Sequence, residues 1–201
     1  MAHRNVISRG WVSAPGTQMV LTVYHAAPDD LYTTLEVPGI GVIASGYSDG
    51  IAWELNPIMG PRLLRGDEAA MEARRADFYA TLNYTTHYPQ RTVVGRAIFA
   101  DAEVWEVSAR TIQGDDETLY FDIDTGMLRG SKVVSHTETG AMISTTTFRE
   151  HREISGILLP VVMAQESGGV EVLITLYEVY YDVETMPSLA PPPVVLELIS
   201  P

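Results

Sequence analysis

The 201-residue sequence contains no cysteine and a single lysine, Lys132. Without cysteine, the chain has no disulfide framework, no thiol nucleophile and no thiolate metal site. Basic residues are scarce, with 13 Lys and Arg against 26 Asp and Glu, which gives a formal net charge of −13. The arginines are scattered along the chain and form no basic stripe. Because nucleic-acid binding needs a basic patch that contacts phosphates, we expect no nucleic-acid partner.

Long apolar runs are also missing. No stretch approaches the ~18 apolar residues of a transmembrane helix, and no apolar signal-peptide core follows residues 1–5. We therefore expect no transmembrane segment, and either a cytoplasmic protein or an extracytoplasmic one whose signal is absent from this sequence. The chain is nevertheless 46% hydrophobic and only 19% charged, with a mean hydropathy of +0.05. This composition indicates a folded protein that buries a large apolar surface or covers it with a ligand.

Short β-branched and aromatic runs, each closed by Gly, Asp, Asn or Pro, dominate the chain and are typical of β-strands. Strands are predicted at 5–12, 18–26, 31–37, 40–47, 51–55, 92–99, 103–112, 117–123, 129–137, 141–150, 157–166 and 170–181. Asp49-Gly50, Asp124-Thr125-Gly126 and Ser167-Gly168-Gly169 have the residues of hairpin turns. Because the connections are too short for crossover helices, sequence neighbours should pair antiparallel.

Residues 67–82 differ from the rest because they lack internal Gly and Pro and are rich in Ala, Glu, Met and Arg. They predict one principal helix with Asp67 as its N-cap. A period of 3.6 residues places Met71, Arg75, Phe78 and Leu82 on one helical face.

The chain after residue 185 contains Pro187 and Pro191-Pro192-Pro193, which predict a stiff, extended segment. We therefore divide the chain into a β-domain at 1–185 and a Pro-rich C-terminal tail at 186–201. Residues 194–199 are expected either to add an edge strand or to belong to whatever follows in a longer protein.

Two of the predicted strands, at 19–24 and 170–181, are apolar on both faces. In a sheet with one solvent-exposed face, apolar and polar residues alternate along each strand. These strands do not alternate in this way, so both of their faces should be covered. One helix covers only part of one face. The sequence therefore predicts a mainly β protein whose curved antiparallel sheet forms an unclosed half-barrel around an apolar interior, with the principal helix packed against it.

The same strand faces predict which side chains line a ligand cavity, although a one-residue slip in register would invert the choice. These candidate ligand-binding residues are Met19, Leu21, Val23, Trp53, Trp105, Val107, Phe148, Val172, Ile174 and Leu176. No metal ligand or cofactor is predicted, because the histidines show no H-x-x-x-H spacing and no glycine-rich phosphate loop precedes a helix.

Residues 46–50, Gly-Tyr-Ser-Asp-Gly, match the G-x-S-x-G pattern of a nucleophile elbow. A serine hydrolase that uses Ser48 with His136 or His151 is therefore one alternative function. The elbow requires a strand-to-helix turn, however, and residues 51–55 look like a second strand. This context favours a plain hairpin turn, so we predict no catalytic residue.

Two other polar segments could suggest a functional site, but we interpret both as structural. Residues 149–153, Arg-Glu-His-Arg-Glu, form a charge cluster typical of a solvated strand end. Residues 124–126 contain the D-T-G triplet of aspartic proteases, whose mechanism needs two such carboxylates. A single copy would require a homodimer, and a β-turn that joins two strands accounts for the residues better.

Taken in order, these segments resemble the LolA-like family of bacterial lipoprotein-carrier and outer-membrane lipoprotein-sorting domains. Residues 45–53 are similar to the family's G-x-D-G-x-x-x-W hairpin, and 148–160 to its Y-x-x-V-x-G-I-x-x-P strand. Between them lie an Ala-rich helix and the segment 120–128. The resemblance runs over about residues 4–185 and implies a LolA/LolB-like unclosed barrel wrapped on a helix, without the family's long N-terminal helix.

The resemblance also implies a function. A LolA-like domain would bind or carry a lipid, a lipoprotein acyl chain or another hydrophobic ligand without enzymatic chemistry, with an envelope protein as a further partner. It would act in the periplasm or another extracytoplasmic compartment. The main alternative is a structural or protein-interaction module whose own side chains fill the core.

Overall fold

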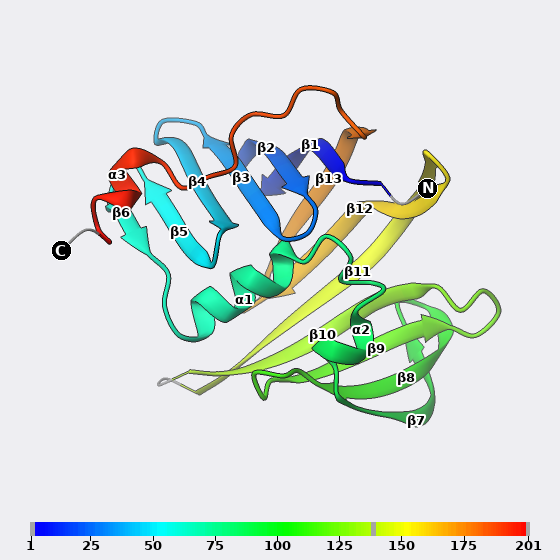
Figure 1. Ribbon diagram of the computed structural model, residues 1–201. Coiled ribbons are helices and arrows are strands. Elements are labelled where there is room, and N and C mark those ends of the chain that lie inside the picture. Colours follow the sequence, from blue (N-terminus) through cyan, green and yellow to red (C-terminus); the bar gives the residue numbers. More distant parts are fainter. Residues whose placement is uncertain (1–2, 138–139, 200–201) are drawn as a thin grey trace. The chain divides into compact units, whose positions relative to one another are not determined.

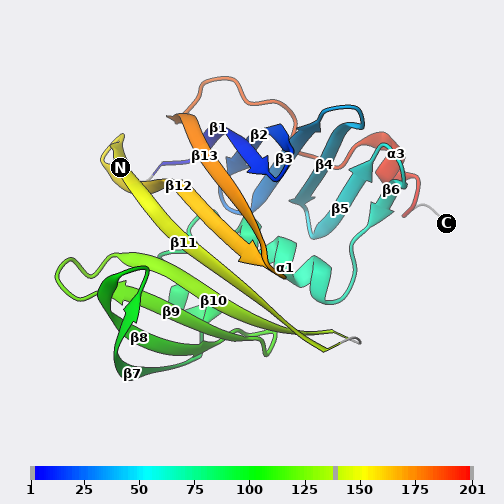
Figure 2. The ribbon, with the colours of Figure 1, turned by 180° about the vertical axis from the view of Figure 1, so that it is seen from behind.

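The structure is a computed structural model that describes residues 3–137 and 140–199. Within these residues, thirteen strands form one antiparallel sheet that does not close into a barrel (Figures 1 and 2). The prediction of a mainly β protein with an unclosed antiparallel sheet is therefore confirmed. None of the helices in the described part of the chain is long and apolar enough to span a membrane.

The strands follow one another along the sheet almost entirely in sequence order. Their bounds are β1 (Asn5–Ala14), β2 (Thr17–Ala26), β3 (Asp30–Val37), β4 (Gly41–Ser48), β5 (Ile51–Asn56), β6 (Gly60–Leu63), β7 (Gln90–Phe99), β8 (Ala102–Arg110), β9 (Asp116–Asp122), β10 (Leu128–Thr137), β11 (Gly140–Ile154), β12 (Ile157–Ser167) and β13 (Val170–Tyr181). The hydrogen-bonded order is β6-β5-β4-β3-β2-β1-β13-β12-β11-β10-β9-β8-β7. Every predicted strand is present, and all neighbours except β1 and β13 are also neighbours in sequence.

Among the strands of the described residues, only β6 was not predicted from the sequence. This four-residue strand contains Gly60 and Pro61, both of which are depleted in strands. It lies at one edge of the sheet, where the missing N–H of a proline leaves no ladder hydrogen bond unmade.

The chain divides into two compact units. Unit 1 comprises Met1–Val12, Thr17–Leu82 and Leu176–Pro201, and unit 2 comprises Ser13–Gly16 and Asn83–Thr175. Unit 1 thus contains β2–β6 and the C-terminal segment, whereas unit 2 contains β7–β12. The predicted division into a domain at 1–185 and a tail at 186–201 stays a prediction.

In unit 1, helix α1 (Asp67–Ala76) packs against β3, β4 and β5 (Figure 1). The predicted helix was too long, since residues 77–82 form turns, and the N-cap is Gly66 rather than Asp67. The helical face that carries Met71 is not the buried one: Met71 is 53% exposed, whereas Glu72 and Ala76 are buried. A helix that ends at Ala76 has no place for the apolar pair Phe78 and Leu82, so another face packs on the sheet.

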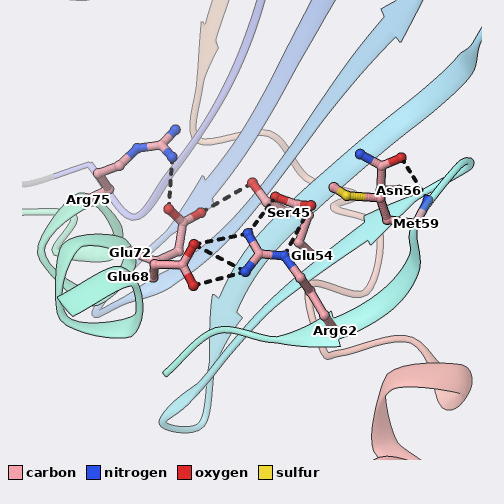
Figure 3. A network of polar contacts seen from close by, with 8 residues as sticks. All are labelled: Ser45, Glu54, Asn56, Met59, Arg62, Glu68, Glu72 and Arg75. Carbon is pink, nitrogen blue, oxygen red and sulfur yellow. Dashed lines mark hydrogen bonds and ion pairs between the residues drawn. The ribbon is translucent and has the colours of Figure 1, made fainter. Parts of the chain in front are cut away.

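Glu72 belongs to the buried helix face because polar partners surround its carboxylate. It accepts hydrogen bonds from the Ser45 hydroxyl at 3.3 Å and from the Arg75 guanidinium at 2.8 Å (Figure 3). A buried carboxylate without such partners would be strongly destabilising. The contact with Ser45 therefore fixes α1 on one face of β4.

Arg62 makes a second link between α1 and the sheet. Its guanidinium pairs with Glu54 on β5 at 3.2 Å and with Glu68 on α1 at 2.9 Å (Figure 3). The hydrogen bonds to Glu68 and Glu54 raise the pKa of Arg62, and the Arg62 hydrogen bond lowers the pKa of Glu68. Because Arg62 and Glu68 are exposed to solvent, these pairs contribute to orientation more than to stability.

The opposite face of the unit 1 sheet carries an apolar core around Trp53, which is fully buried beside Ala44 and Val195. Gly46 on β4 permits this packing, because a Cβ atom there would lie 2.8 Å from the Trp53 ring. Val195 comes from helix α3 (Pro193–Leu196). The expected edge strand at 194–199 is therefore wrong: Pro193 at the first helical position favours a helical turn, and this turn buries Val195.

The described residues of unit 2 include their own buried side chains and one short helix, α2 (Tyr84–His87). The Tyr88 hydroxyl, just after α2, donates a 2.8 Å hydrogen bond to the carboxylate of Glu117 on β9. Leu119 lies two residues further along the same face of β9 and is 4% exposed. On the other face, Phe99 stacks on Tyr120 with ring centroids 4.1 Å apart.

Candidate ligand-binding site

Five predicted ligand-binding residues, Trp105, Val107, Phe148, Val172 and Ile174, lie in unit 2 and share one face of its sheet. Directly opposite residues of neighbouring strands point to the same face, as do residues two apart on one strand. The cross-strand pairs that connect the five are Trp105↔Phe121, Val107↔Leu119, Leu119↔Ser131, Ser131↔Thr146, Phe148↔Met163, Met163↔Ile174 and Gln165↔Val172. We call this surface the Trp105 face.

The Trp105 face is buried at one end and half-open elsewhere. Beneath the α2 segment, Ala109 and Glu117 are only 3% and 7% exposed. Trp105 is 39% exposed, and the Arg96 guanidinium lies over its ring at 5.4 Å from the centroid. Val107, Phe148, Val172 and Ile174 are half-buried. The face thus presents a row of apolar side chains that are only partly buried.

The predicted residues of unit 1 do not share one face. Met19, Leu21 and Val23 alternate on β2 toward the face of Ser45, which bonds to α1. Trp53 points to the other face, where it fills the core of unit 1. Leu176 is half-buried and lies on the same side of β13 as Val172 and Ile174. The binding role of all ten residues stays a prediction.

A pocket of about 160 Å³ lies at the other end of β9–β11, in unit 2. It is lined by the end of β9, the β9–β10 turn, and neighbouring parts of β10 and β11. The lining residues are Asp122, Thr125, Met127, Arg129, Phe148, Arg149 and His151. Only Phe148 among them was predicted to contact a ligand.

Asp122 has a saturated set of hydrogen bonds. Its Oδ1 accepts from the backbone N–H of Asp124 at 3.2 Å, and from the backbone N–H and hydroxyl of Thr125 at 2.9 and 2.8 Å. Its Oδ2 accepts from Arg129 Nε at 2.7 Å. The Arg129 guanidinium, followed by the Thr125 donors, holds the pKa of Asp122 well below its usual range. Asp122 is therefore a fixed anion that orders the turn, which confirms the β-turn interpretation of residues 124–126.

Ser48 lies at the end of β4 in a hairpin with β5. Asp49 and Gly50 both have positive φ, at 50° and 78°, as a two-residue hairpin turn requires. Ser48 is 5% exposed and donates a 2.5 Å hydrogen bond to Asp30 Oδ1. The hairpin prediction is confirmed, because a strand and not a helix follows the motif. The side chain of His136, one of its suggested partners, lies outside the part of the chain that the structure describes.

Sequence patterns did not predict that Arg129, Arg149 and His151 belong to one site. Arg149 and His151 were predicted to lie at a solvated strand end, and Arg149 is indeed exposed. The local signal was the charge cluster at 149–153 beside the Asp-rich turn. Strand alternation assigns Phe148 to the face opposite Arg149 and His151, so it gave no reason to group all of them in one pocket.

No protein-family model matches the sequence, and neither does any curated protein sequence. The fold, however, is similar to those of other solved proteins, among them three crystal structures. They are a DUF1329 family protein from Desulfovibrio piger (13% identity, TM-score 0.65, 92% of this chain and 88% of that one), the LolA superfamily protein NE2245 from Nitrosomonas europaea (13%, 0.62, 92% and 88%) and an outer-membrane lipoprotein-sorting protein domain from Vibrio parahaemolyticus (10%, 0.60, 90% and 87%). The chain therefore has a LolA-like fold.

Proposed function

We propose that the protein binds the apolar part of a lipid, a lipoprotein acyl chain or a similar hydrophobic ligand in the bacterial cell envelope, without chemistry on that ligand. The observation that carries this proposal is the Trp105 face, where apolar side chains from β8, β11 and β13 are aligned and only half-buried. Contiguous, partly exposed apolar surfaces of this kind typically bind a ligand or partner.

The LolA-like fold supports the class of ligand and the compartment. Proteins of similar fold include a domain described as an outer-membrane lipoprotein-sorting protein. The net charge of −13 also suits a carrier, because it disfavours non-specific adhesion to anionic membrane surfaces. The buried Ser48, hydrogen-bonded to Asp30 in a hairpin, supports a role without catalysis.

The strength of binding should depend on alkyl chain length. Each methylene that the Trp105 face removes from water contributes about 0.8 kcal/mol, which corresponds to about a fourfold lower Kd. We expect decyl maltoside to bind more weakly than dodecyl maltoside by about one order of magnitude when both are titrated below their micelle-forming concentrations.

Two neighbouring residues of β13 provide a matched pair of variants. Ile174 lies on the Trp105 face, whereas Leu173 is half-buried on the opposite face. Ile174→Gln should weaken dodecyl maltoside binding about tenfold, and Leu173→Gln should leave it unchanged, as measured by native mass spectrometry and calorimetry on folded protein. Equal loss in both variants would contradict the assignment of the face, and no binding to the unmodified protein would favour the interaction-module alternative.

A further inference from the structure

Two β-bulges occur on neighbouring strands in unit 2, and each contains an arginine. The pairing of β10 with β9 shifts between Leu128 and Gly130, where Arg129 is the extra residue. The pairing of β11 with β12 shifts between Phe148 and Glu150, where Arg149 is the extra residue, and again between Glu150 and His151. Because β10 and β11 pair directly, through Gly130↔Thr147 at this point, the two arginines lie at nearly the same height of the sheet.

The bulge on β11 changes which side chains meet. In a regular strand, Phe148 and Arg149 would point to opposite faces, and yet Phe148, Arg149 and His151 all line the 160 Å³ pocket. Bulges commonly redirect a side chain in this way beside functional sites. The pocket therefore combines cationic donors from two strands with an aromatic ring of the Trp105 face.

The side chains that line the pocket include more cations than anions, in a protein whose net charge is −13. The ionised side chains of the pocket are Asp122, Arg129 and Arg149. The Asp122 carboxylate accepts a hydrogen bond from Arg129 Nε. Its other oxygen accepts hydrogen bonds from Asp124 and Thr125 of the turn. Within the pocket lining, one carboxylate thus offsets one of the two guanidinium groups, and the second, Arg149, pairs with Glu171, which does not line the pocket.

Most nitrogen donors of the pocket are available to a ligand. In the described part of the chain, Arg129 uses only Nε, and Arg149 uses only Nη2, which pairs with Glu171 at 2.7 Å. The ring nitrogens of His151 have no hydrogen-bond partner there. The Arg149–Glu171 pair is solvent-exposed, at 47% and 56%, so its loss costs little. Forked guanidinium groups of this kind match phosphate and carboxylate oxygens.

We propose that this pocket binds the oxyanion, phosphate or carboxylate, of an amphipathic ligand whose alkyl chain lies on the Trp105 face. The assignment rests on the proposed function. A volume of about 160 Å³ is below the ~300–1,000 Å³ of pockets that enclose a whole small molecule, and therefore suits a head group alone. Phe148, which lines the pocket and belongs to the Trp105 face, connects the two parts of the site.

The test compares ligands that share a chain and differ in the head group. Dodecyl phosphate, dodecyl maltoside and inorganic phosphate are titrated by calorimetry into the full chain at constant ionic strength. Dodecyl phosphate should bind at least about tenfold more tightly than dodecyl maltoside, since charge-assisted hydrogen bonds are the stronger kind. Inorganic phosphate should compete with dodecyl phosphate and not with dodecyl maltoside.

Variants test whether the arginines of the pocket cause the preference for dodecyl phosphate. Arg149→Gln should remove most of the preference for dodecyl phosphate and leave dodecyl maltoside binding unchanged. Arg129→Gln should do the same, but it also frees Asp122 and perturbs the turn, so Arg149→Gln is the decisive variant. Arg152→Gln is the matched control, because Arg152 is an exposed arginine of β11 that pairs with Glu150 and does not line the pocket. It should keep the preference.

The outcomes separate this inference from the proposed function. Equal affinity for the two dodecyl ligands, or an unchanged preference in Arg149→Gln, overturns the oxyanion pocket and leaves the proposed function standing. Failure of both dodecyl ligands to bind overturns both. Binding of inorganic phosphate alone would mean that the pocket takes a free anion, which also overturns the head-group assignment.

Discussion

Unit 1 and unit 2 are both built mainly from strands, but their helices cover the strands to different extents. In unit 1, α1 packs on one face of β3–β5, and Val195 of α3 packs against Trp53 on the other. In unit 2, the α2 segment covers one end of the Trp105 face, through Tyr88 and Glu117.

The exposed fractions of one tryptophan in each unit show this difference. Trp53 is fully buried, whereas Trp105 is 39% exposed. An apolar strand face therefore has two uses in this protein: in unit 1 it forms a core filled by the chain itself, and in unit 2 it remains available to a ligand. This comparison is the reason to place the proposed binding surface in unit 2.

The largest expected effect comes from the two tryptophans themselves. Trp53→Ala should lower the free energy of unfolding by about 3–5 kcal/mol, because it leaves a cavity in a packed core. Trp105→Ala should cost about 1 kcal/mol, since this ring is partly in water already. Urea unfolding followed by circular dichroism measures both. Similar losses for the two variants would mean that unit 2 is packed as tightly as unit 1.

A smaller effect is expected from the C-terminal helix. Val195→Asp should lower the free energy of unfolding by about 1.5–3 kcal/mol, because α3 would undock rather than bury a carboxylate against Trp53, so the loss is limited to the burial of one side chain. Val194 is 39% exposed, and Val194→Asp should change stability by less than about 0.5 kcal/mol. Urea unfolding of both variants tests this, and a neutral Val195→Asp would contradict the role of α3 as a cover.

The smallest effect concerns pH. Burial lowers the pKa of His25 from 6.5, only partly offset by the hydrogen bond to the Ala76 carbonyl at 2.8 Å. As the pH falls below about 6.5, the unfolded chain binds a proton that folded His25 resists, so the free energy of unfolding decreases until the folded pKa is reached. His25→Gln should reduce this dependence between about pH 8 and pH 5, measured by urea unfolding. If the free energy of unfolding of His25→Gln depended on pH as strongly as before, other groups would be responsible for the pH dependence.

Strands were predictable from sequence because their pattern is local. The turn residues Asp49-Gly50 and the alternation on β2 and β13 are readable without knowledge of what packs on them. Helix α1 shows the limit of this reasoning. Its length and its buried face depended on partners far away in sequence, such as Ser45 for Glu72, and a buried glutamate is not what an apolar period predicts.

The candidate site was likewise predictable from the sequence only in part. Alternation grouped Trp105, Val107, Phe148, Val172 and Ile174 correctly on one face of unit 2. It also added Trp53, whose face turned out to be filled by Val195 from a helix that was not predicted. The pocket was missed because the bulges at Arg129 and Arg149 break the alternation on which the prediction depended.

By itself, the sequence determined the strand content, the hairpin connectivity, the net negative charge and the absence of thiol chemistry, because these follow from composition and from patterns within a few residues. Only the tertiary structure decided which apolar face is a filled core and which is half-open, and which charged side chains meet in a pocket. The physical reason is that burial and proximity depend on non-local packing: Val195 covers Trp53 from the far end of the chain, and two bulges turn Arg129 and Arg149 to one pocket.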